Sequence, residues 1–389
     1  MIQTLISERF DIMQTVDLIV ECAMDVKREK LIGRLGRIKY RVPIINAYVV
    51  EIPVQHIGEI SGMDGIKNVY RAVPMTVQTR KHTGRGISIA VLDTGVSPVF
   101  DLVKPKNRII AFKDFINGQK EPYDDNGHGT HVAGIAAGNG WMSGGKYSGI
   151  ASEANIIGIK ILDKSGGGGS GEVLAGLQWV LDNRMKFGIR IVNLSMGTVE
   201  AHSKDPLVKA VEAAWDAGIV ITVAAGNNGP KPGSVTSPGI SRKVVTVGSS
   251  DDKNSVQIWG DTLENFSGRG PTLDCIVKPD LLAPGTNIVS CLSADVSISS
   301  TSHSKIKVVD NHYLQMSGTS MSTPIVAGAI ALLLEKHPTL TPNDVKYMLK
   351  QCATPLDYPP NQQGWGLLNI EKLMTLPPVS QIAQKQQYR

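Results

Sequence analysis

The sequence predicts an α/β fold: a doubly wound, mostly parallel sheet with helices on both faces, preceded by a small α+β domain. From Ile87 onward, near-continuous apolar runs alternate with segments of helical periodicity. Strands that are apolar throughout suit a parallel sheet that is covered on both faces. Before about Gln78 the strands and helices are shorter and more amphipathic. The 389 residues also exceed the size at which a single hydrophobic core stops growing, so two domains are expected.

In the N-terminal part, short strands and helices are expected in turn. The expected strands are residues 16–20 and 44–52, the expected helices are 27–35 and 54–63, and residues 69–73 are extended again. Such a short α+β pattern predicts a separate small unit.

In the larger part, the expected strands are residues 87–92, 156–162, 189–194, 219–225 and 244–247, and the expected helices are 172–186, 206–217 and 324–336. The second of these helices has clear end signals. Asp205 is a suitable N-cap, Pro206 suits the first helical position and Gly218 suits the end. Residues 375–389 are rich in glutamine and lack periodicity, so a mobile tail is expected.

The composition is that of an ordinary globular protein, with 42% hydrophobic and 19% charged residues. Aromatic residues make up only 5% of the chain and the net charge is +5, without the basic, aromatic-rich stripe of a nucleic-acid binder. No apolar run is long enough to span a membrane, and the N-terminus lacks the pattern of a secretory signal. The widely spaced cysteines, expected to be reduced, are Cys22, Cys275, Cys291 and Cys352. A cytoplasmic location is therefore expected, although a secreted protein whose signal had been removed would look the same.

Three short motifs supply an acid, a base and a nucleophile. Asp93 begins Asp-Thr-Gly at the end of the first apolar strand, where open α/β sheets place their sites. His128 begins His-Gly-Thr-His, and Ser320 lies in Gly-Thr-Ser-Met-Ser before a long apolar helix. A serine hydroxyl becomes a nucleophile only beside a base that is itself oriented by a third group.

Each motif also has another interpretation. Asp-Thr-Gly occurs in aspartic proteases, but those need two such carboxylates. His128 and His131 share a helix face and could bind zinc, but no third histidine or cysteine lies nearby in the sequence, and the pair Asp124 and Asp125 is a weak substitute. Ser320, like Ser317 and Ser322, could simply cap a helix.

Taken together, the motifs and their order Asp, His, Ser resemble the subtilisin-like serine proteases (subtilases) over about residues 84–373. The resemblance implies a serine endopeptidase that cuts polypeptide substrates through an acyl-enzyme. Ser320 would attack, His128 would move the proton and Asp93 would orient His128. Asn227, in Ala-Ala-Gly-Asn-Asn-Gly, would hold the oxyanion together with the backbone N–H of Ser320. A catalytically silent peptide-binding protein on the same fold is the alternative.

The resemblance also implies the substrate site. A glycine run and a second segment would clasp an extended peptide, and neutral residues would line the main specificity pocket, favouring an apolar or aromatic substrate residue. A phosphate loop is excluded for the glycine run because no Gly-Lys-Ser/Thr follows it. The expected substrate-binding residues are Gly167, Gly168, Gly169, Ser195, Met196, Gly197, Ala224, Gly226 and Thr236.

Residues 1–80 resemble the inhibitory propeptide of subtilases, which would make this segment a partner of residues 81–374; an ordinary accessory domain is the alternative. The end of the propeptide, residues 74–80, is expected in the active-site cleft. No cofactor is certain. Subtilases often bind calcium in the loop after the histidine helix, but here that loop, residues 138–146, has no carboxylates. The usual calcium site is therefore expected to be absent, and a weaker one elsewhere is possible.

Overall fold

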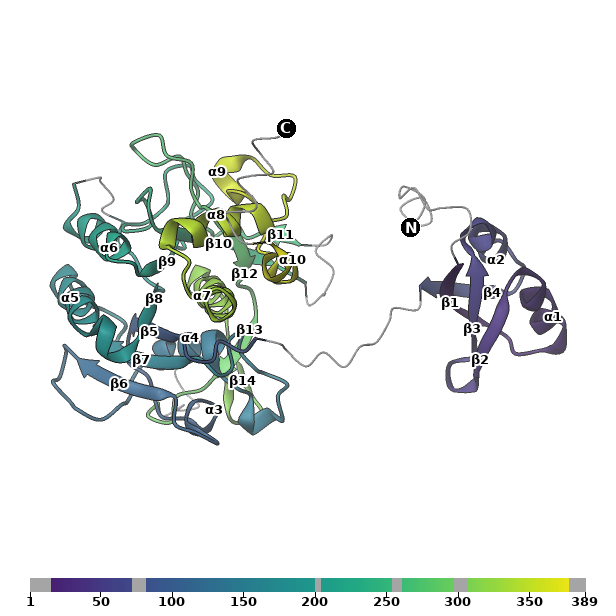
Figure 1. Ribbon diagram of the computed structural model, residues 1–389, viewed down its shortest axis with the longest axis horizontal. Helices are drawn as coiled ribbons and strands as arrows, with labels where there is room; N and C mark the ends of the chain where they lie inside the picture. Colours follow the sequence, from purple (N-terminus) through teal and green to yellow (C-terminus); the bar gives the residue numbers. More distant parts are fainter. Residues whose placement is uncertain (1–14, 72–81, 200–203, 254–260, 297–306, 378–389) are drawn as a thin grey trace. The chain divides into compact units, whose positions relative to one another are not determined.

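The computed structural model describes residues 15–71, 82–199, 204–253, 261–296 and 307–377. The chain divides into two compact units, Met1–Thr79 and Arg80–Arg389, called here the N-terminal and C-terminal units (Figure 1). Each unit is described by itself. The expectations for residues 74–80 and for most of the tail fall outside the described residues.

The N-terminal unit is an antiparallel sheet with two helices and a small core of its own. The strand order is β2-β3-β1-β4. Alternation along β1 turns Leu18, Val20 and Cys22 inward, where they pack with residues such as Ile32 and Ile60. Its elements are β1 (Thr15–Cys22), α1 (Val26–Leu35), β2 (Arg37–Val42), β3 (Ala47–Pro53), α2 (Ile57–Ser61) and β4 (Ile66–Arg71).

Two expected elements of this unit differ in detail. The expected strand 44–52 begins three residues late, because Pro43–Ile45 form a 3-10 turn in which Pro43 supplies no backbone donor. The expected helix 54–63 is a 3-10 turn, Val54–His56, followed by the short α2. Strand β2 was not expected, because its charged residues hide the alternation.

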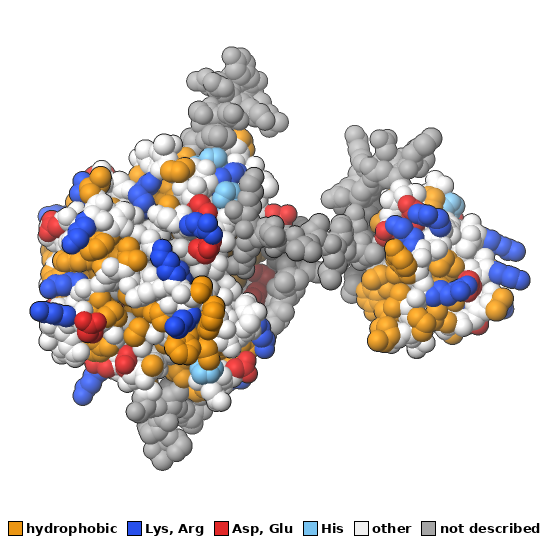
Figure 2. All heavy atoms as spheres, turned by 60° about the horizontal axis from the view of Figure 1, so that its bottom comes forward, with side chains coloured by type: hydrophobic (Ala, Val, Ile, Leu, Met, Phe, Trp, Pro, Cys, Tyr) orange, Lys and Arg blue, Asp and Glu red, His pale blue; other side chains and the backbone are white. Residues whose placement is uncertain are grey.

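The other face of the N-terminal sheet carries an apolar row. Ile19 pairs with Val49 on one side and with Tyr70 on the other, and Val49 pairs with Tyr40. The row thus crosses all the strands of this sheet. Tyr40 is 66% exposed and Tyr70 is 51% exposed. Figure 2 shows hydrophobic side chains gathered on this unit.

The C-terminal unit confirms the doubly wound fold. Its sheet has the order β11-β10-β9-β8-β5-β7-β6, with β12 also paired to β10, and only β11 is antiparallel to its neighbour among these described strands. The strands are β5 (Ser88–Asp93), β6 (Ile109–Asp114), β7 (Asn155–Lys160), β8 (Ile189–Leu194), β9 (Val220–Ala224), β10 (Val245–Asp251), β11 (Thr262–Leu263) and β12 (Leu281–Pro284).

Helices cover both faces of this sheet, with α4 and α7 side by side on one face and α5 and α6 on the other (Figure 1). This double cover explains why β5, β8 and β9 read as continuous apolar runs. A small sheet of β13 (Ile288–Cys291), β14 (Lys307–Val309) and β15 (Tyr313–Met316) packs beside α4. The helices are α3 (Phe100–Val103), α4 (His128–Ala137), α5 (Ser170–Phe187), α6 (Pro206–Asp216), α7 (Thr319–Lys336), α8 (Pro342–Cys352), α9 (Pro360–Gln363) and α10 (Ile370–Thr375).

Helix α7 starts five residues before the expected position, at Thr319 instead of Pro324. Proline is common at the first helical position, which suggested the later start. Pro324 instead lies inside the helix and cannot donate to the carbonyl of Ser320. The hydroxyl of Ser195 donates to that carbonyl at 2.9 Å, so the lost helical hydrogen bond is replaced.

The far end of α7 holds the start of the C-terminal unit. Glu335 Oε2 accepts hydrogen bonds from the backbone N–H groups of Thr83 and Gly84, both at 2.7 Å. None of the helices in the described segments is long and apolar enough to cross a membrane.

Candidate active site

The residues expected to act as acid, base and nucleophile come from three elements that meet at the carboxyl edge of the sheet. Asp93 is the last residue of β5, His128 is the first of α4 and Ser320 is the second of α7. Because both helices begin at this edge, their free N–H groups and dipoles favour negative charge there.

Asp93 and His128 form a hydrogen-bonded pair. His128 Nδ1 lies 2.7 Å from Asp93 Oδ1, which also accepts the backbone N–H of Thr94 at 2.8 Å. Asp93 is fully buried, whereas the His128 side chain is 22% exposed. An ionised carboxylate can only accept, so His128 Nδ1 donates and Nε2 is left as the basic nitrogen of the neutral ring.

Two opposed effects set the protonation of His128. Burial lowers the pKa of His128, but attraction to Asp93, the hydrogen bond between them and the more distant Asp124 together raise this pKa above its usual value. A base of raised pKa holds a proton more readily once it has taken one from a nucleophile.

Ser320 is held by a reciprocal pair of hydrogen bonds with Ser195. The Ser320 hydroxyl donates to the Ser195 carbonyl at 2.9 Å, and the Ser195 hydroxyl donates to the Ser320 carbonyl at 2.9 Å. Ser320 and His128, which both lie in the described part of the chain, are not hydrogen-bonded to each other. The hydroxyl therefore needs to turn about its Cα–Cβ bond to reach His128, and such bonds often form only when substrate binds.

Asn227 lies beyond the end of β9, next to Ser320. Its Oδ1 accepts from both the backbone N–H of Thr319, at 3.0 Å, and the Thr319 hydroxyl, at 2.9 Å. The amide oxygen is thus occupied, and Nδ2 is the group of this side chain that can donate to a ligand. A Cβ added at Gly318 would lie 3.2 Å from Nδ2, so glycine keeps this approach open.

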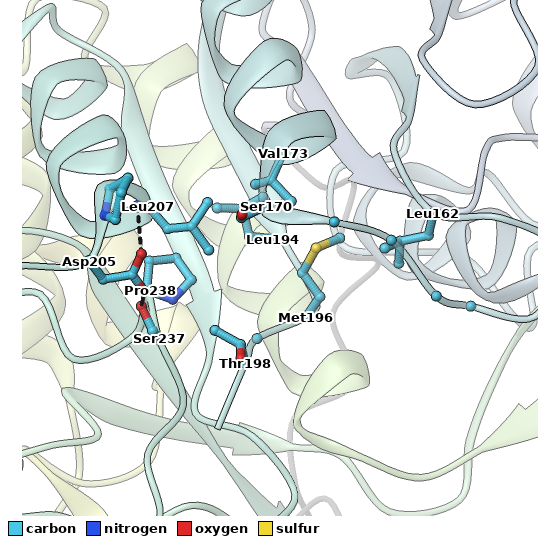
Figure 3. Close-up of a pocket in the computed structure, with 16 residues that line it drawn as sticks. Leu162, Ser170, Val173, Leu194, Met196, Thr198, Asp205, Leu207, Ser237 and Pro238 are labelled. Atoms are coloured by element: carbon cyan, nitrogen blue, oxygen red, sulfur yellow. Dashed lines mark hydrogen bonds between the residues drawn. The ribbon is translucent and has the colours of Figure 1, made fainter. Parts of the chain in front are cut away.

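A pocket of about 510 Å³ lies between the glycine run and the segment after β8, and Ser195 of that segment is hydrogen-bonded to Ser320 (Figure 3). Of the expected substrate-binding residues, Gly167, Gly168, Gly169, Met196 and Gly197 line it. Asp205 also lines it, but its carboxylate accepts from Leu207 N and from the Ser237 hydroxyl, as the dashed lines show. The other wall residues include Leu162, Val173, Leu194, Leu207 and Pro238, which the sequence did not single out.

The remaining expected residues, Ser195, Ala224, Gly226 and Thr236, do not line this pocket. Thr236 lies between two glycines instead. A Cβ added at Gly197 would lie 2.3 Å from Thr236 Oγ1, and one at Gly226 would lie 2.6 Å from its Cγ2. The Thr236 side chain thus fills the space between these backbone segments.

The alternative of a histidine metal site finds no support. His131 is fully buried, and its Nε2 donates towards the carbonyls of Leu314 (2.8 Å) and Ile288 (3.2 Å). Burial lowers the pKa of His131 to about 4, so the ring is neutral. Asp124 is also committed, since it accepts from Thr94, Gly127 and Thr130. Among the described residues, no group of three or more His, Cys, Asp or Glu could hold a metal ion.

Comparison with known proteins agrees with this arrangement. The family model described as the subtilase family matches residues 84–366. Serine protease AprX of Bacillus subtilis is 46% identical over 297 residues, which cover 74% of this chain and 66% of that protein. Subtilisin Savinase of Lederbergia lenta is 33% identical over 78% of this chain and 96% of its own length.

Solved structures show the same likeness. A cold-adapted subtilisin-like serine proteinase aligns with a TM-score of 0.56 and 30% identity, over 77% of this chain and 93% of its own. The S41 psychrophilic protease aligns with a TM-score of 0.60 and 30% identity, over 74% and 92%. The fold and the matched motifs define a serine protease of the α/β type. The chain belongs to the subtilase family.

Proposed function

We propose that the chain hydrolyses peptide bonds with Asp93, His128 and Ser320 as its catalytic triad. The observation that carries this proposal is the 2.7 Å hydrogen bond between His128 Nδ1 and the fully buried Asp93. The bond fixes the tautomer whose Nε2 can accept a proton from a serine hydroxyl.

In the first half of the reaction, the Ser320 hydroxyl turns from Ser195 to His128 and attacks the scissile carbonyl carbon. The hydroxyl proton moves to His128 Nε2, and the new oxyanion accepts from Asn227 Nδ2 and from the Ser320 N–H. His128 then gives the proton to the leaving amine as the C–N bond breaks. Water attacks the resulting ester by the same route and releases the acid.

Labelling with a fluorophosphonate tests this assignment. Wild-type protein should be labelled at Ser320, and S320A should be folded, unlabelled and nearly inactive on casein. Two neighbouring serines are matched controls. Ser317 accepts a hydrogen bond from Asn287 N, and Ser322 is fully buried. S317A and S322A should label like the wild type; casein cleavage by S320A at the wild-type rate would contradict the proposal.

The substrate is an extended polypeptide, held between residues 167–169 and 195–197. Both segments offer backbone at the rim of the pocket, and the wall side chains Leu162, Val173 and Leu207 are apolar. The protease therefore prefers apolar side chains. A peptide-library profile dominated by lysine or arginine would contradict this preference.

Residues 1–80 act as the inhibitory propeptide of a zymogen. Two features support this role: the N-terminal unit has its own core, and the apolar row of Tyr40, Val49, Ile19 and Tyr70 is left uncovered on its sheet. Exposed rows of this kind commonly mark a binding surface. Because the segment is tethered, even weak binding would block the site.

The test refolds residues 81–389 with and without separately added residues 1–80. The added segment should inhibit the peptidase or raise the refolding yield. A matched segment carrying Y40S and Y70S should do so less well, because both tyrosines belong to the exposed row. If the unmodified segment has neither effect, residues 1–80 are an accessory domain.

Calcium does not fit the loop 138–146. One carboxylate beside this loop is Asp101, whose oxygens accept from Met142 N at 2.9 Å and from the Tyr313 hydroxyl at 2.8 Å. Protein donors therefore already satisfy the group that would bind the ion, and calcium needs several oxygen ligands. A weaker site elsewhere in the chain remains part of the proposal.

A further inference from the structure

One buried cation near the site has no part in the reaction above. Lys160 is the last residue of β7 and its side chain is 0% exposed. Burying an ammonium group is costly unless it is paired and fully hydrogen-bonded. A lysine buried in this position is therefore expected to have a charged partner and a full set of hydrogen-bond acceptors.

The Lys160 ammonium group uses all its donors. Nζ donates to the Thr94 carbonyl at 2.6 Å, to Asp125 Oδ1 at 2.6 Å and to the Leu162 carbonyl at 3.0 Å. The ring of Tyr123 lies 5.1 Å from Nζ. An ammonium group has three N–H donors, so its hydrogen-bonding capacity is matched by these acceptors.

These acceptors belong to three separate parts of the site. Thr94 follows Asp93, and its backbone N–H donates to the Asp93 carboxylate. Asp125 is in the loop that leads to His128. Leu162 lines the pocket and precedes the glycine run. The Lys160 ammonium group thus connects the turn after Asp93, the loop before His128 and the rim of the substrate pocket.

A neutral side chain could not replace this group. The loop before His128 carries two adjacent carboxylates: Asp124 is fully buried and accepts from the hydroxyl of Thr94, the residue after Asp93, and Asp125 is 32% exposed. Like charges repel, and most strongly where they are buried. A cation bonded to Asp125 offsets that repulsion, and each of its hydrogen bonds fixes a backbone or side-chain position.

We propose that Lys160 is a positioning residue that holds the Asp93–His128 pair in register with the substrate pocket. This inference rests on the proposed function, since it assumes that the pair serves Ser320. A displacement of about 1 Å at a reacting centre can cost about 100-fold in rate. We therefore expect K160M to lower kcat/KM on a long peptide by about 10- to 100-fold.

The test measures kcat and KM for peptide p-nitroanilides with two to five residues before the scissile bond. The concentration of active sites, which enters kcat, is determined by titration with a fluorophosphonate. In wild-type protein, kcat/KM should rise once the peptide is long enough to fill the pocket. In K160M, kcat should fall and this gain with length should shrink, because Leu162 is no longer tied to Thr94. D125A removes the link towards His128 and the charged partner of Lys160, but leaves the carbonyls of Thr94 and Leu162 as acceptors, so kcat should fall while the gain with length persists.

A matched control is available. Lys278 is also a buried lysine, but it donates to Asp280, Thr246 and Val244 away from the site. K278M should alter stability and leave both kinetic quantities unchanged. If K160M has the wild-type kcat per titrated site and the wild-type gain with peptide length, the positioning role of Lys160 is wrong. Labelling of Ser320 by the fluorophosphonate in this variant would show that the proposed function itself still holds. Should K160M yield no titratable sites, an unchanged kcat in D125A overturns the proposal.

Discussion

Thr236 is expected to decide whether a substrate side chain can enter the space between Gly197 and Gly226. Its side chain lies between Gly197 and Gly226, is 3% exposed, and has a hydroxyl without a partner among the described residues. Because this side chain fills the space between the two backbone segments, a large aromatic substrate side chain has little room. T236G removes Cβ, Oγ1 and Cγ2 and should open that space.

The expected gain follows from the apolar surface that a substrate can then bury. If a phenylalanine ring places carbon atoms where the threonine atoms were, each buried methylene-sized group contributes about 0.8 kcal/mol, and the total is about 2.4 kcal/mol. This energy corresponds to a gain of about 50-fold in kcat/KM for phenylalanine relative to alanine just before the cut.

The assay compares two peptide p-nitroanilides that differ only in that residue, with enzyme titrated for active sites. T236V is the control, because it keeps the volume of the side chain and loses only the hydroxyl; its ratio should stay near that of the wild type. An unchanged phenylalanine-to-alanine ratio in T236G would show that Thr236 does not exclude large side chains from the space between Gly197 and Gly226.

Three further results are expected. N227A should lower kcat by about 100- to 1,000-fold with little change in KM, as known for the oxyanion asparagine of subtilisin, and a wild-type kcat would exclude this role. Burial lowers the pKa of Lys278 to about 8 from an unfolded value of 10.5, so unfolded chains bind more protons between these pH values and stability should rise with pH there. Urea titrations should show that K278M lacks this rise. Asp280 still has a charged partner in this variant, because Lys346 Nζ lies 3.1 Å from Asp280 Oδ1. A chelator should change the melting temperature little, since Asp101 is already satisfied; a large fall would reveal a calcium site.

The sequence predicted those features that depend on short segments. Asp93 follows an apolar run and His128 precedes one, so their places at a strand end and a helix start could be expected from β5 and α4. The family resemblance and the doubly wound fold follow from such local signals, and both are confirmed.

Features that depend on distant contacts could not be predicted. The apolar wall of the pocket joins Leu162, Val173 and Leu207 from three different elements. The early start of α7 depends on the Ser195 hydroxyl, which substitutes for the donor that Pro324 lacks. Lys160 ends an apolar strand and would ordinarily reach solvent; here its side chain is fully buried and pairs with Asp125, which is itself 32% exposed.

The hydrogen bonds from Thr83 and Gly84 to Glu335 limit which peptide bonds before Thr83 could reach Ser320 of the same molecule. Ser320 and Glu335 lie on one helix, whose rise of 1.5 Å per residue separates them by about 22 Å. An extended chain covers about 3.5 Å per residue, so about six or more residues are needed to return from Thr83 to the nucleophile. While Glu335 holds Thr83 and Gly84, Ser320 of the same molecule can reach only bonds that lie about six or more residues before Thr83. A cut nearer to Thr83 would require either release of Thr83 and Gly84 or a second protease molecule, and the two routes differ in their dependence on protein concentration.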